Sequence, residues 1–376
     1  MSAGRPRLLV VTPDLPPARG GIQALMGGLL DAFERFRVRV VALDSPGARD
    51  HDRAAGWDVL RVPTRARLGP ARNLVLNAAA LGDAVRLRPD AALHAHIVTS
   101  PAAVAAGRFP GVPHMVIYHA NEILGKPRLA AFAARHADAA MVVSGYTESL
   151  LLQAGGRPER VHRIAPGVTL PTVEREPGER PTILTIARLT DAYKGHDVLL
   201  EALPAIRARV PDVAWVVVGE GPLRPSLEAR ARAVGVDDAV SFIGGVSDAE
   251  RDAWLARATL FAMPSRLPAG GLAGEGFGIV FLEAAAYGLP VVAGNVAGAL
   301  DAVSAGETGL LVDPTDPAAV AEAICALLLD PERARTLGEA GAARARSFAW
   351  PAVAARVEDV LLGLIAARGA GGCHGA

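Results

Sequence analysis

Two glutamates in this 376-residue chain, Glu275 and Glu283, stand with seven residues between them. Glycines surround the first, and an apolar run carries the second about two turns into a predicted helix. Glycines let a backbone approach a ligand closely, and the positive end of a helix suits a phosphate group. One carboxylate can then contact a sugar near that phosphate, and the other can accept hydrogen bonds from ribose hydroxyls. The pattern is therefore compatible with a nucleotide-sugar site, and the alternative is two glutamates that have this spacing by chance, as in many helices.

Two cations could bind the diphosphate of such a ligand. Arg188 follows the apolar run 182–187, which predicts a buried strand, and Lys194 precedes a predicted helix that opens near His196. The carboxyl end of a strand is where ligands bind to α/β sheets. An arginine offers a bidentate fork and a lysine a point charge, and both suit a diphosphate.

A glycine pair and a histidine are further candidates in the first half of the chain. Gly20 and Gly21 stand between an apolar strand (7–12) and an apolar helix (24–33), which is the order of a phosphate-approach loop. Neither G-x-G-x-x-G nor the P-loop lysine is present, so a plain strand–helix turn is the alternative. His119 ends another predicted strand, where a hydrogen-bonded strand-end histidine is the alternative to a site residue.

Two patterns could hold a metal, and both favour another interpretation. Asp50-His51-Asp52 spells Asp-x-Asp in what reads as a polar loop, and a solvated turn is expected there. His94 and His96 share one face of a strand, but no third ligand is evident, so we expect a polar pair at a strand end. The two cysteines, Cys325 and Cys373, lack metal-ligand spacing. The sequence therefore predicts no metal site and no cofactor other than a nucleotide-sugar substrate.

Composition limits the class of protein. Hydrophobic residues make up 51% and charged residues 21%, which supports a large core. A net charge of zero argues against nucleic acid as a partner. The apolar run at the start is broken by Pro13 and Asp14, so it predicts a strand instead of a signal peptide, and no run approaches the ~18 residues of a spanning helix. We expect a cytoplasmic protein.

A basic stretch in the first half could contact an anionic membrane from the cytoplasmic side. An apolar helix (73–81) lies among six arginines. These are Arg61, Arg65, Arg67, Arg72, Arg86 and Arg88. An arginine-rich chain has such runs by default, so a solvated face remains the alternative.

Strands and helices alternate along the whole chain, which predicts an α/β protein with two doubly wound, Rossmann-like domains. Residues 170–180 are rich in proline and charge and predict a linker. We place the first domain at 1–170 and the second at 171–347. Residues 348–376 then form a terminal helix that returns to the first domain, followed by a loose glycine-rich tail from Arg368.

The combined pattern resembles retaining GT-B glycosyltransferases of family 4, in particular GDP-mannose-dependent phosphatidylinositol mannosyltransferases. That family has Glu, seven residues and Glu at this place. Three further stretches match its motifs: Gly219-Glu220-Gly221-Pro222, Pro166-Gly167-Val168 and Phe348-Ala349-Trp350. The resemblance covers residues 7 to about 365 and is strongest from 182 to 313. One departure from the family pattern is the insertion 191–193 before Lys194. It weakens the assignment of the donor more than the assignment of Arg188 and Lys194 to the diphosphate.

The resemblance implies roles for particular residues. The catalytic set would be His119, Glu275, Arg188 and Lys194. The donor-binding set would be Gly20, Gly21, Arg188, Lys194, Gly219, Gly244, Val246, Glu275, Gly276, Phe277, Gly278, Ile279 and Glu283. His119 would contact the transferred sugar, and backbone groups near Gly244 and Val246 would hold the base.

The resemblance implies a retaining, metal-independent hexosyltransferase. GDP-mannose is the favoured donor, and the acceptor is a hydroxyl on a lipid or polyol. One alternative is a UDP-sugar-dependent member of family 4 that acts on a polysaccharide or secondary metabolite. Two others are a sugar-nucleotide 2-epimerase, which would lack the Gly-Gly and His-x-x-Glu patterns, and a non-enzymatic binding protein, which would not keep the full charged set.

Overall fold

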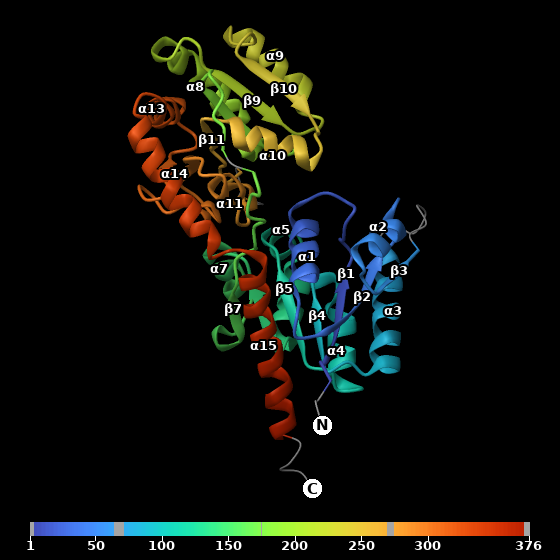
Figure 1. Cartoon of the computed structure of the whole chain (residues 1–376). Coiled ribbons are helices and arrows are strands. Elements are labelled where there is room, and N and C mark those ends of the chain that lie inside the picture. Colours follow the sequence, from blue (N-terminus) through green and yellow to red (C-terminus); the bar gives the residue numbers. More distant parts are fainter. Residues whose placement is uncertain (1–3, 64–70, 174, 269–273, 372–376) are drawn as a thin grey trace. The chain divides into compact units, whose positions relative to one another are not determined.

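The structure, a computed structural model, describes residues 4–63, 71–173, 175–268 and 274–371. The chain forms two compact units, residues 1–167 together with 350–376 and residues 168–349. The sequence had suggested boundaries at 170/171 and 347/348. Each unit contains a parallel α/β sheet, as the alternating pattern predicts (Figure 1).

The sheet of the first unit has the strand order β3-β2-β1-β4-β5-β6-β7. Its strands are β1 (Arg7–Thr12), β2 (Arg37–Leu43), β3 (Val59–Val62), β4 (Ala91–His94), β5 (His114–Tyr118), β6 (Ala139–Val142) and β7 (Val161–Arg163). Every neighbouring pair is parallel. Because parallel strands need crossovers, helices separate the strands along the chain. They are α1 (Gly21–Ala32), α2 (Ala48–Ala55), α3 (Arg72–Leu87), α4 (Ser100–Arg108), α5 (Ala120–Gly125), α6 (Pro127–His136) and α7 (Gly145–Gln153).

Both faces of this sheet are buried, which explains the continuous apolar runs of its strands. Leu9 and Val11 of β1 join a cluster with Leu76 and Ala80 of α3, while the neighbouring Leu8 and Val10 are also fully buried. The sequence therefore predicted strands correctly from runs without alternation.

The last helix, α15 (Trp350–Gly371), packs beside α1 in the first unit (Figure 1). Trp350 fits against two glycines: a Cβ atom built on Gly28 would lie 2.2 Å from its ring, and one on Gly167 would lie 2.3 Å away. The buried carboxylate of Glu358 then accepts hydrogen bonds from the backbone amides of Glu34 and Arg35 at 3.0 and 2.7 Å. The expected tail from Arg368 is helical as far as Gly371, and residues 372–376 lie outside the described residues.

The sheet of the second unit has the order β10-β9-β8-β11-β12-β13, again all parallel. Its strands are β8 (Thr182–Ile186), β9 (Ala214–Val218), β10 (Val240–Gly244), β11 (Leu260–Met263), β12 (Val291–Gly294) and β13 (Gly309–Val312). Its helices are α8 (His196–Arg209), α9 (Arg224–Val234), α10 (Asp248–Arg257), α11 (Ile279–Ala286), α12 (Ala299–Ala302), α13 (Pro317–Leu328) and α14 (Pro331–Arg346). Short 3-10 turns cover Ile97–Thr99 (η2), Pro158–Arg160 (η3) and Ala192–Lys194 (η4).

One segment was wrongly expected to be a loop. Asp50, His51 and Asp52 lie in α2, which begins and ends at glycines in the left-handed conformation, Gly47 and Gly56. Asp52 is buried and pairs with the equally buried Arg61 at 2.6 Å. Asp52 is therefore neither a metal ligand of an Asp-x-Asp site nor part of a solvated turn.

Candidate active site

The predicted site residues fall into two sets, one in each unit, and both sets lie at the carboxyl edge of a sheet. In the first unit the chain runs from β1 outward to β3 and then returns to β4 beside β1. The carboxyl ends of β1 and β4 therefore flank the switch point where α/β ligands bind. Asp14 lies two residues beyond β1 and His96 two residues beyond β4.

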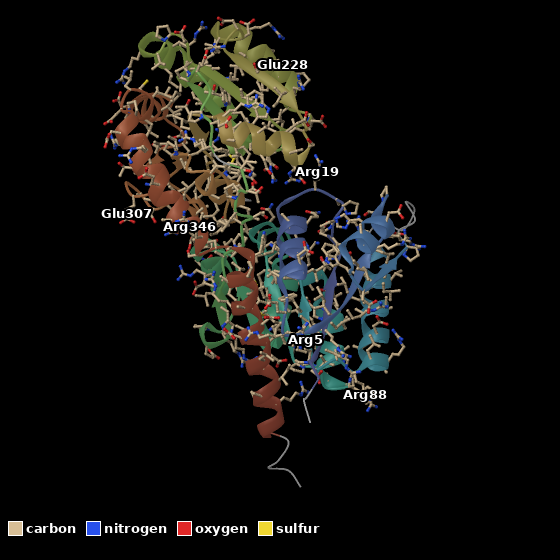
Figure 2. The ribbon with its side chains drawn as sticks, in the orientation of Figure 1. Arg5, Arg19, Arg88, Glu228, Glu307 and Arg346 are labelled. Atoms are coloured by element: carbon tan, nitrogen blue, oxygen red, sulfur yellow. The ribbon has the colours of Figure 1, made fainter. Side chains whose placement is uncertain are left out.

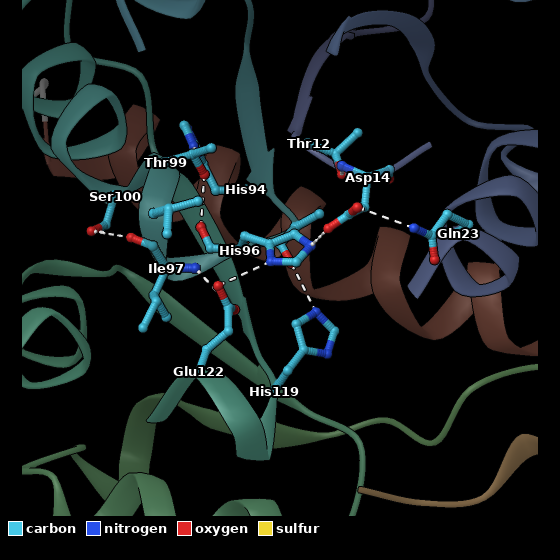
Figure 3. A network of polar contacts seen from close by, with 12 residues as sticks. Thr12, Asp14, Gln23, His94, His96, Ile97, Thr99, Ser100, His119 and Glu122 are labelled. Carbon is cyan, nitrogen blue, oxygen red and sulfur yellow. Dashed lines mark hydrogen bonds and ion pairs between the residues drawn. The ribbon is translucent and has the colours of Figure 1, made fainter. Parts of the chain in front are cut away.

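His96 stands between two carboxylates (Figure 3). Its Nε2 atom lies 3.0 Å from Asp14 Oδ2, and its Nδ1 atom lies 3.0 Å from Glu122 Oε1. A neutral imidazole has one N–H group, so two ion pairs require the imidazolium form. Burial lowers the pKa of His96, but the two carboxylates outweigh it and raise the value to about 9. The group of three thus carries a net charge of −1 near neutral pH.

His119, the predicted catalytic histidine, lies beside this group, with its ring centroid 5.0 Å from that of His96. Its Nε2 atom is 2.9 Å from the carbonyl oxygen of Ala95 (Figure 3). A carbonyl only accepts, so Nε2 carries the proton, and Nδ1 keeps its lone pair. Burial and the charge on His96 lower the pKa of His119 to about 4. Neutral His119 can therefore accept a hydrogen bond from a hydroxyl.

His96, His119 and Glu122 each offer one atom to a possible metal ion, and these atoms lie within 4.8 Å of one another. The sequence paired His96 with His94 and found no third ligand; both points are corrected. His94 is buried separately, with Nδ1 3.0 Å from the hydroxyl of Thr99. When His96 is protonated, both of its ring nitrogens face carboxylates, so in this form neither nitrogen offers a lone pair to a metal ion.

The glycine pair lies at the start of α1, which begins at Gly21, three residues before the helix start expected at residue 24. Gly20 is the residue before the helix, and its carbonyl accepts from the amide of Ala24 at 2.9 Å. Gln23, in the first turn, donates from Nε2 to Asp14 Oδ1 at 3.0 Å (Figure 3). The glycine loop is thus connected to His96 through Asp14, a residue that the sequence analysis did not assign to the site.

The second unit has its own switch point, between β8 and β11, and the predicted cations follow β8. Arg188 is 69% exposed and lies 3.7 Å from Asp191. Lys194 ends the η4 turn, and its side chain is only 13% exposed. The exposed guanidinium can therefore meet a ligand directly, while the ammonium is held within the unit.

Lys194 forms a close ion pair with Glu275, which is also 13% exposed. Burial lowers the pKa of Lys194, but the carboxylate of Glu275 outweighs it, and the pKa ends above its ordinary value. The two residues are 81 positions apart in the sequence. The structure thus brings together the predicted diphosphate-binding cation and the predicted sugar-binding carboxylate.

The turn that carries Lys194 is fixed by the segment after β11. Arg266 forms a two-pronged ion pair with Asp197 of α8, with distances of 2.8 and 2.7 Å. Its amide donates to the carbonyl of Tyr193 at 2.8 Å. These contacts hold the residues on both sides of Lys194, and no pattern in the sequence predicted them.

The glycine-rich stretch before α11 is shaped by backbone conformation. Gly278, at φ +86°, is the residue before the helix, and the carbonyl of Glu275 accepts from the amide of Gly298 at 3.0 Å. Phe277 is buried and packs near Phe348, so only its backbone can face a ligand. A Cβ built on Gly276 would meet no atom within 4 Å, and Ile279 is the first helical residue.

Glu283 lies a little more than one turn into α11, where the sequence suggested about two. Burial raises the pKa of its carboxyl group, and Arg251 of α10 opposes that effect. The guanidinium Nη1 atom lies 3.3 Å from Glu283 Oε1. Arg251 was not predicted, because its helix lies two elements earlier in the chain.

The remaining predicted donor residues follow neighbouring strands. Gly219 directly follows β9 and has φ +140°, and a Cβ built on it would lie 2.0 Å from the carbonyl oxygen of Ala187. Its amide donates to the carbonyl of Gly244 at 2.8 Å. Gly244 ends β10, and Val246 follows it before α10. Only a glycine fits such close backbone packing beside Arg188.

The comparisons with known proteins agree with this geometry. Residues 169–344 match the family model "Glycosyl transferases group 1", and residues 19–170 match "Glycosyltransferase Family 4". A Mycobacterium tuberculosis protein named GDP-mannose-dependent alpha-(1-6)-phosphatidylinositol monomannoside mannosyltransferase is 37% identical, over 96% of this chain and 100% of that protein. A protein of the same name from Mycolicibacterium smegmatis is 34% identical, with the same coverage.

Solved structures show the same fold. Anabaena Alr3699/HepE in complex with UDP superposes with a TM-score of 0.81 at 21% identity, covering 95% of this chain and 100% of that one. Sucrose-phosphate synthase from Thermosynechococcus elongatus gives 0.78 at 22% identity, covering 96% and 100%.

Two parallel α/β units with a charged set at each carboxyl edge, together with these matches, define an enzyme of the GT-B glycosyltransferase class. The chain belongs to glycosyltransferase family 4.

Proposed function

We propose that this glycosyltransferase moves mannose from GDP-mannose to a hydroxyl of a phosphatidylinositol-type acceptor. The observation that carries this proposal is the similarity, over 96% of the chain, to relatives named for that donor and acceptor class, at 37% and 34% identity. A relative from Corynebacterium glutamicum, named for a monoacylated phosphatidylinositol monomannoside, is 30% identical over the same share.

The residues suggest how the donor would be held. Arg188 and Lys194 would bind the diphosphate and stabilise its charge as the bond to the sugar breaks, which is electrostatic preorganisation. The carboxylate of Glu275 would then leave its ion pair with Lys194 and accept hydrogen bonds from the hydroxyls of the sugar. Glu283 would accept from the ribose, and His119 would accept from a sugar hydroxyl at Nδ1. In this mechanism the electrostatic work is done by side chains, and no metal or other cofactor is required.

We also propose that the anomeric configuration is retained, as the family resemblance implies. The test is the product. The one-bond C1–H1 coupling in its NMR spectrum distinguishes an α- from a β-mannoside made from the α-linked donor. A β-mannoside would contradict retention.

The test of the donor is thermal stabilisation by GDP, GDP-mannose, UDP and UDP-glucose. A ligand at ~100 times its dissociation constant stabilises the folded state by about 2.7 kcal/mol. Selective stabilisation by GDP and GDP-mannose is expected. Selective stabilisation by the uridine ligands would keep the enzyme class and move the function to a UDP-sugar-dependent transferase.

The acceptor class suggests contact with an anionic membrane surface from the cytoplasmic side. No helix among the described residues is long and apolar enough to cross a bilayer. The outer face of α3 instead exposes Leu74 (73%), Val75 (41%) and Val85 (43%). Arg88 lies just beyond its end (Figure 2). Such a face suits the surface of an anionic bilayer.

The basic stretch of the sequence contributes less to this face than expected. Arg61 is buried against Asp52, and Arg65 and Arg67 lie outside the described residues. Co-sedimentation with vesicles containing phosphatidylinositol should weaken in Leu74→Ser. It should not weaken in Leu329→Ser, a control leucine with 52% exposure in the second unit. Equal binding by both variants would contradict the assignment of α3.

A further inference from the structure

The ion pair between Arg251 and Glu283 has a role that neither the family match nor the motif suggests. Three residues of α10 face Glu283 and its surroundings: Asp248, Arg251 and Asp252. The guanidinium lies 3.3 Å from Glu283, 3.4 Å from Asp252 and 4.0 Å from Asp248. Tyr287, one turn after Glu283, faces Asp252. Among the groups acting on Glu283, Arg251 is thus the cation and the others are acidic.

Glu283 depends on this cation. Its side chain is 23% exposed, and burial disfavours the charged form of a carboxyl group. Asp252 and Asp248 add like charges that act in the same direction. A protonated carboxyl group would lose charge and part of its accepting capacity toward hydroxyls. An opposing charge within about 4 Å restores the ionised form.

The contact is also directional. The closest approach of Arg251 to Glu283 is from Nη1 to Oε1, at 3.3 Å. A carboxylate has about four lone-pair sites, so one oxygen can hold the guanidinium while the other accepts two hydroxyl groups. The pair therefore fixes the rotation of the carboxylate at the same time as its charge.

We propose that Arg251 is a positioning residue for the donor: it keeps Glu283 ionised and turned so that Oε2 accepts the 2′- and 3′-hydroxyls of the ribose. This inference rests on the proposed role of Glu283 in nucleotide binding. It assigns to α10 a part in nucleotide affinity through charge and orientation, separate from any contact with the base.

The test is a thermodynamic cycle that combines changes of Arg251 or Glu283 with removal of the ribose hydroxyls from the ligand. The affinities of GDP and 2′,3′-dideoxy-GDP are measured by calorimetry for the wild type, Arg251→Met, Arg251→Lys and Glu283→Gln. In the wild type, the ratio of the dissociation constants of 2′,3′-dideoxy-GDP and GDP should be about 100-fold or more, because two hydrogen bonds to a charged oxygen are lost. In Arg251→Met this ratio should fall to about 3-fold or less, and in Glu283→Gln it should fall likewise. Arg251→Lys, which keeps the charge, should recover part of the ratio.

A pH profile adds a readout that a merely structural role would not move. The affinity of the wild type for GDP should fall as the pH drops through the pKa of Glu283. In Arg251→Met this fall should begin at higher pH, because burial and two aspartates then act on Glu283 unopposed. Arg257→Met, on the same helix, is the matched control and should match the wild type in both ratio and pH profile.

The outcomes separate the two proposals. A wild-type ratio that persists in Arg251→Met would overturn the inference and leave the ribose role of Glu283 intact. A wild-type ratio near one would contradict the role of Glu283 itself and, with it, the inference. If the protein binds UDP in place of GDP, the same cycle applies with UDP and 2′,3′-dideoxy-UDP, because Glu283 would face the ribose in either case.

Discussion

The ion pair between Lys194 and Glu275 predicts that two substitutions at one contact have opposite effects on nucleotide affinity. In the structure the carboxylate of Glu275 pairs with the ammonium group of Lys194, which a diphosphate would need. Lys194→Met removes the cation, and a hydrogen bond to a charged group contributes about 1.5–3 kcal/mol, so GDP should bind about 10- to 150-fold more weakly. Glu275→Gln removes a competitor for the same cation, so GDP should bind as tightly as in the wild type or a few-fold more tightly.

In Glu275→Gln, the rate of transfer and the affinity for GDP should change differently. Glu275 is proposed to hold the transferred sugar, which GDP lacks. Glu275→Gln should therefore lower transfer by about 100-fold or more, the usual cost of losing an electrostatic group of the site. Both quantities are measurable on one preparation, by calorimetry with GDP and by steady-state transfer from GDP-mannose.

The control is a cation outside the site. Arg335 of α14 is 57% exposed and pairs with Glu332 and Glu339, so Arg335→Met should change neither quantity. Equal weakening of GDP binding in Glu275→Gln and Lys194→Met would contradict competition between Glu275 and the diphosphate. That result would mean that Glu275 supports the diphosphate site and does not compete for it.

Three further predictions concern stability and metal ions. Glu358→Ala leaves the amides of Glu34 and Arg35 without their 3.0 and 2.7 Å partner, and urea unfolding should show a loss of about 2–4 kcal/mol; an unchanged midpoint would contradict the capping role. Burial lowers the pKa of His94 to about 3 and of His119 to about 4, so the unfolded chain binds more protons below pH ~6.5. Denaturation between pH 6.5 and 4.5 should therefore show the first unit losing up to about 2.7 kcal/mol per pH unit, whereas a flat profile would contradict neutral histidines. Transfer should survive exhaustive treatment with EDTA, and loss of activity that returns with added metal would show that a cation is required.

The sequence predicted the fold through features that are local. Runs such as Leu8 to Val11 are too apolar for a half-exposed strand, so they indicate sheets covered on both faces. Turn glycines and helix starts, such as Gly278 before α11, also lie within one stretch of chain. The main local error was at Asp50–Asp52, where polar residues formed a short helix because glycines in the left-handed conformation bound it at both ends.

The site was only half predictable, because its contacts depend on strand order. Asp14 and His96 meet because β4 returns beside β1, a crossover that no local pattern encodes. Lys194 and Glu275 were each predicted from motifs, yet their pairing across 81 residues was not. Arg251 stands in no motif, and only the packing of α10 near Glu283 shows its place. An acidic or basic residue just beyond a strand adjacent to the switch point is the signal that could have found Asp14.

Transfer of the sugar can be followed directly on purified protein. The purified protein is incubated with GDP-mannose or UDP-glucose and vesicles containing a phosphatidylinositol mannoside, and the lipids are analysed by mass spectrometry. We expect a product one hexose heavier from GDP-mannose, lost in Glu275→Gln and unchanged in Arg335→Met. No added hexose from GDP-mannose, with one added from UDP-glucose, would contradict the proposed donor, and full activity in Glu275→Gln would contradict the site.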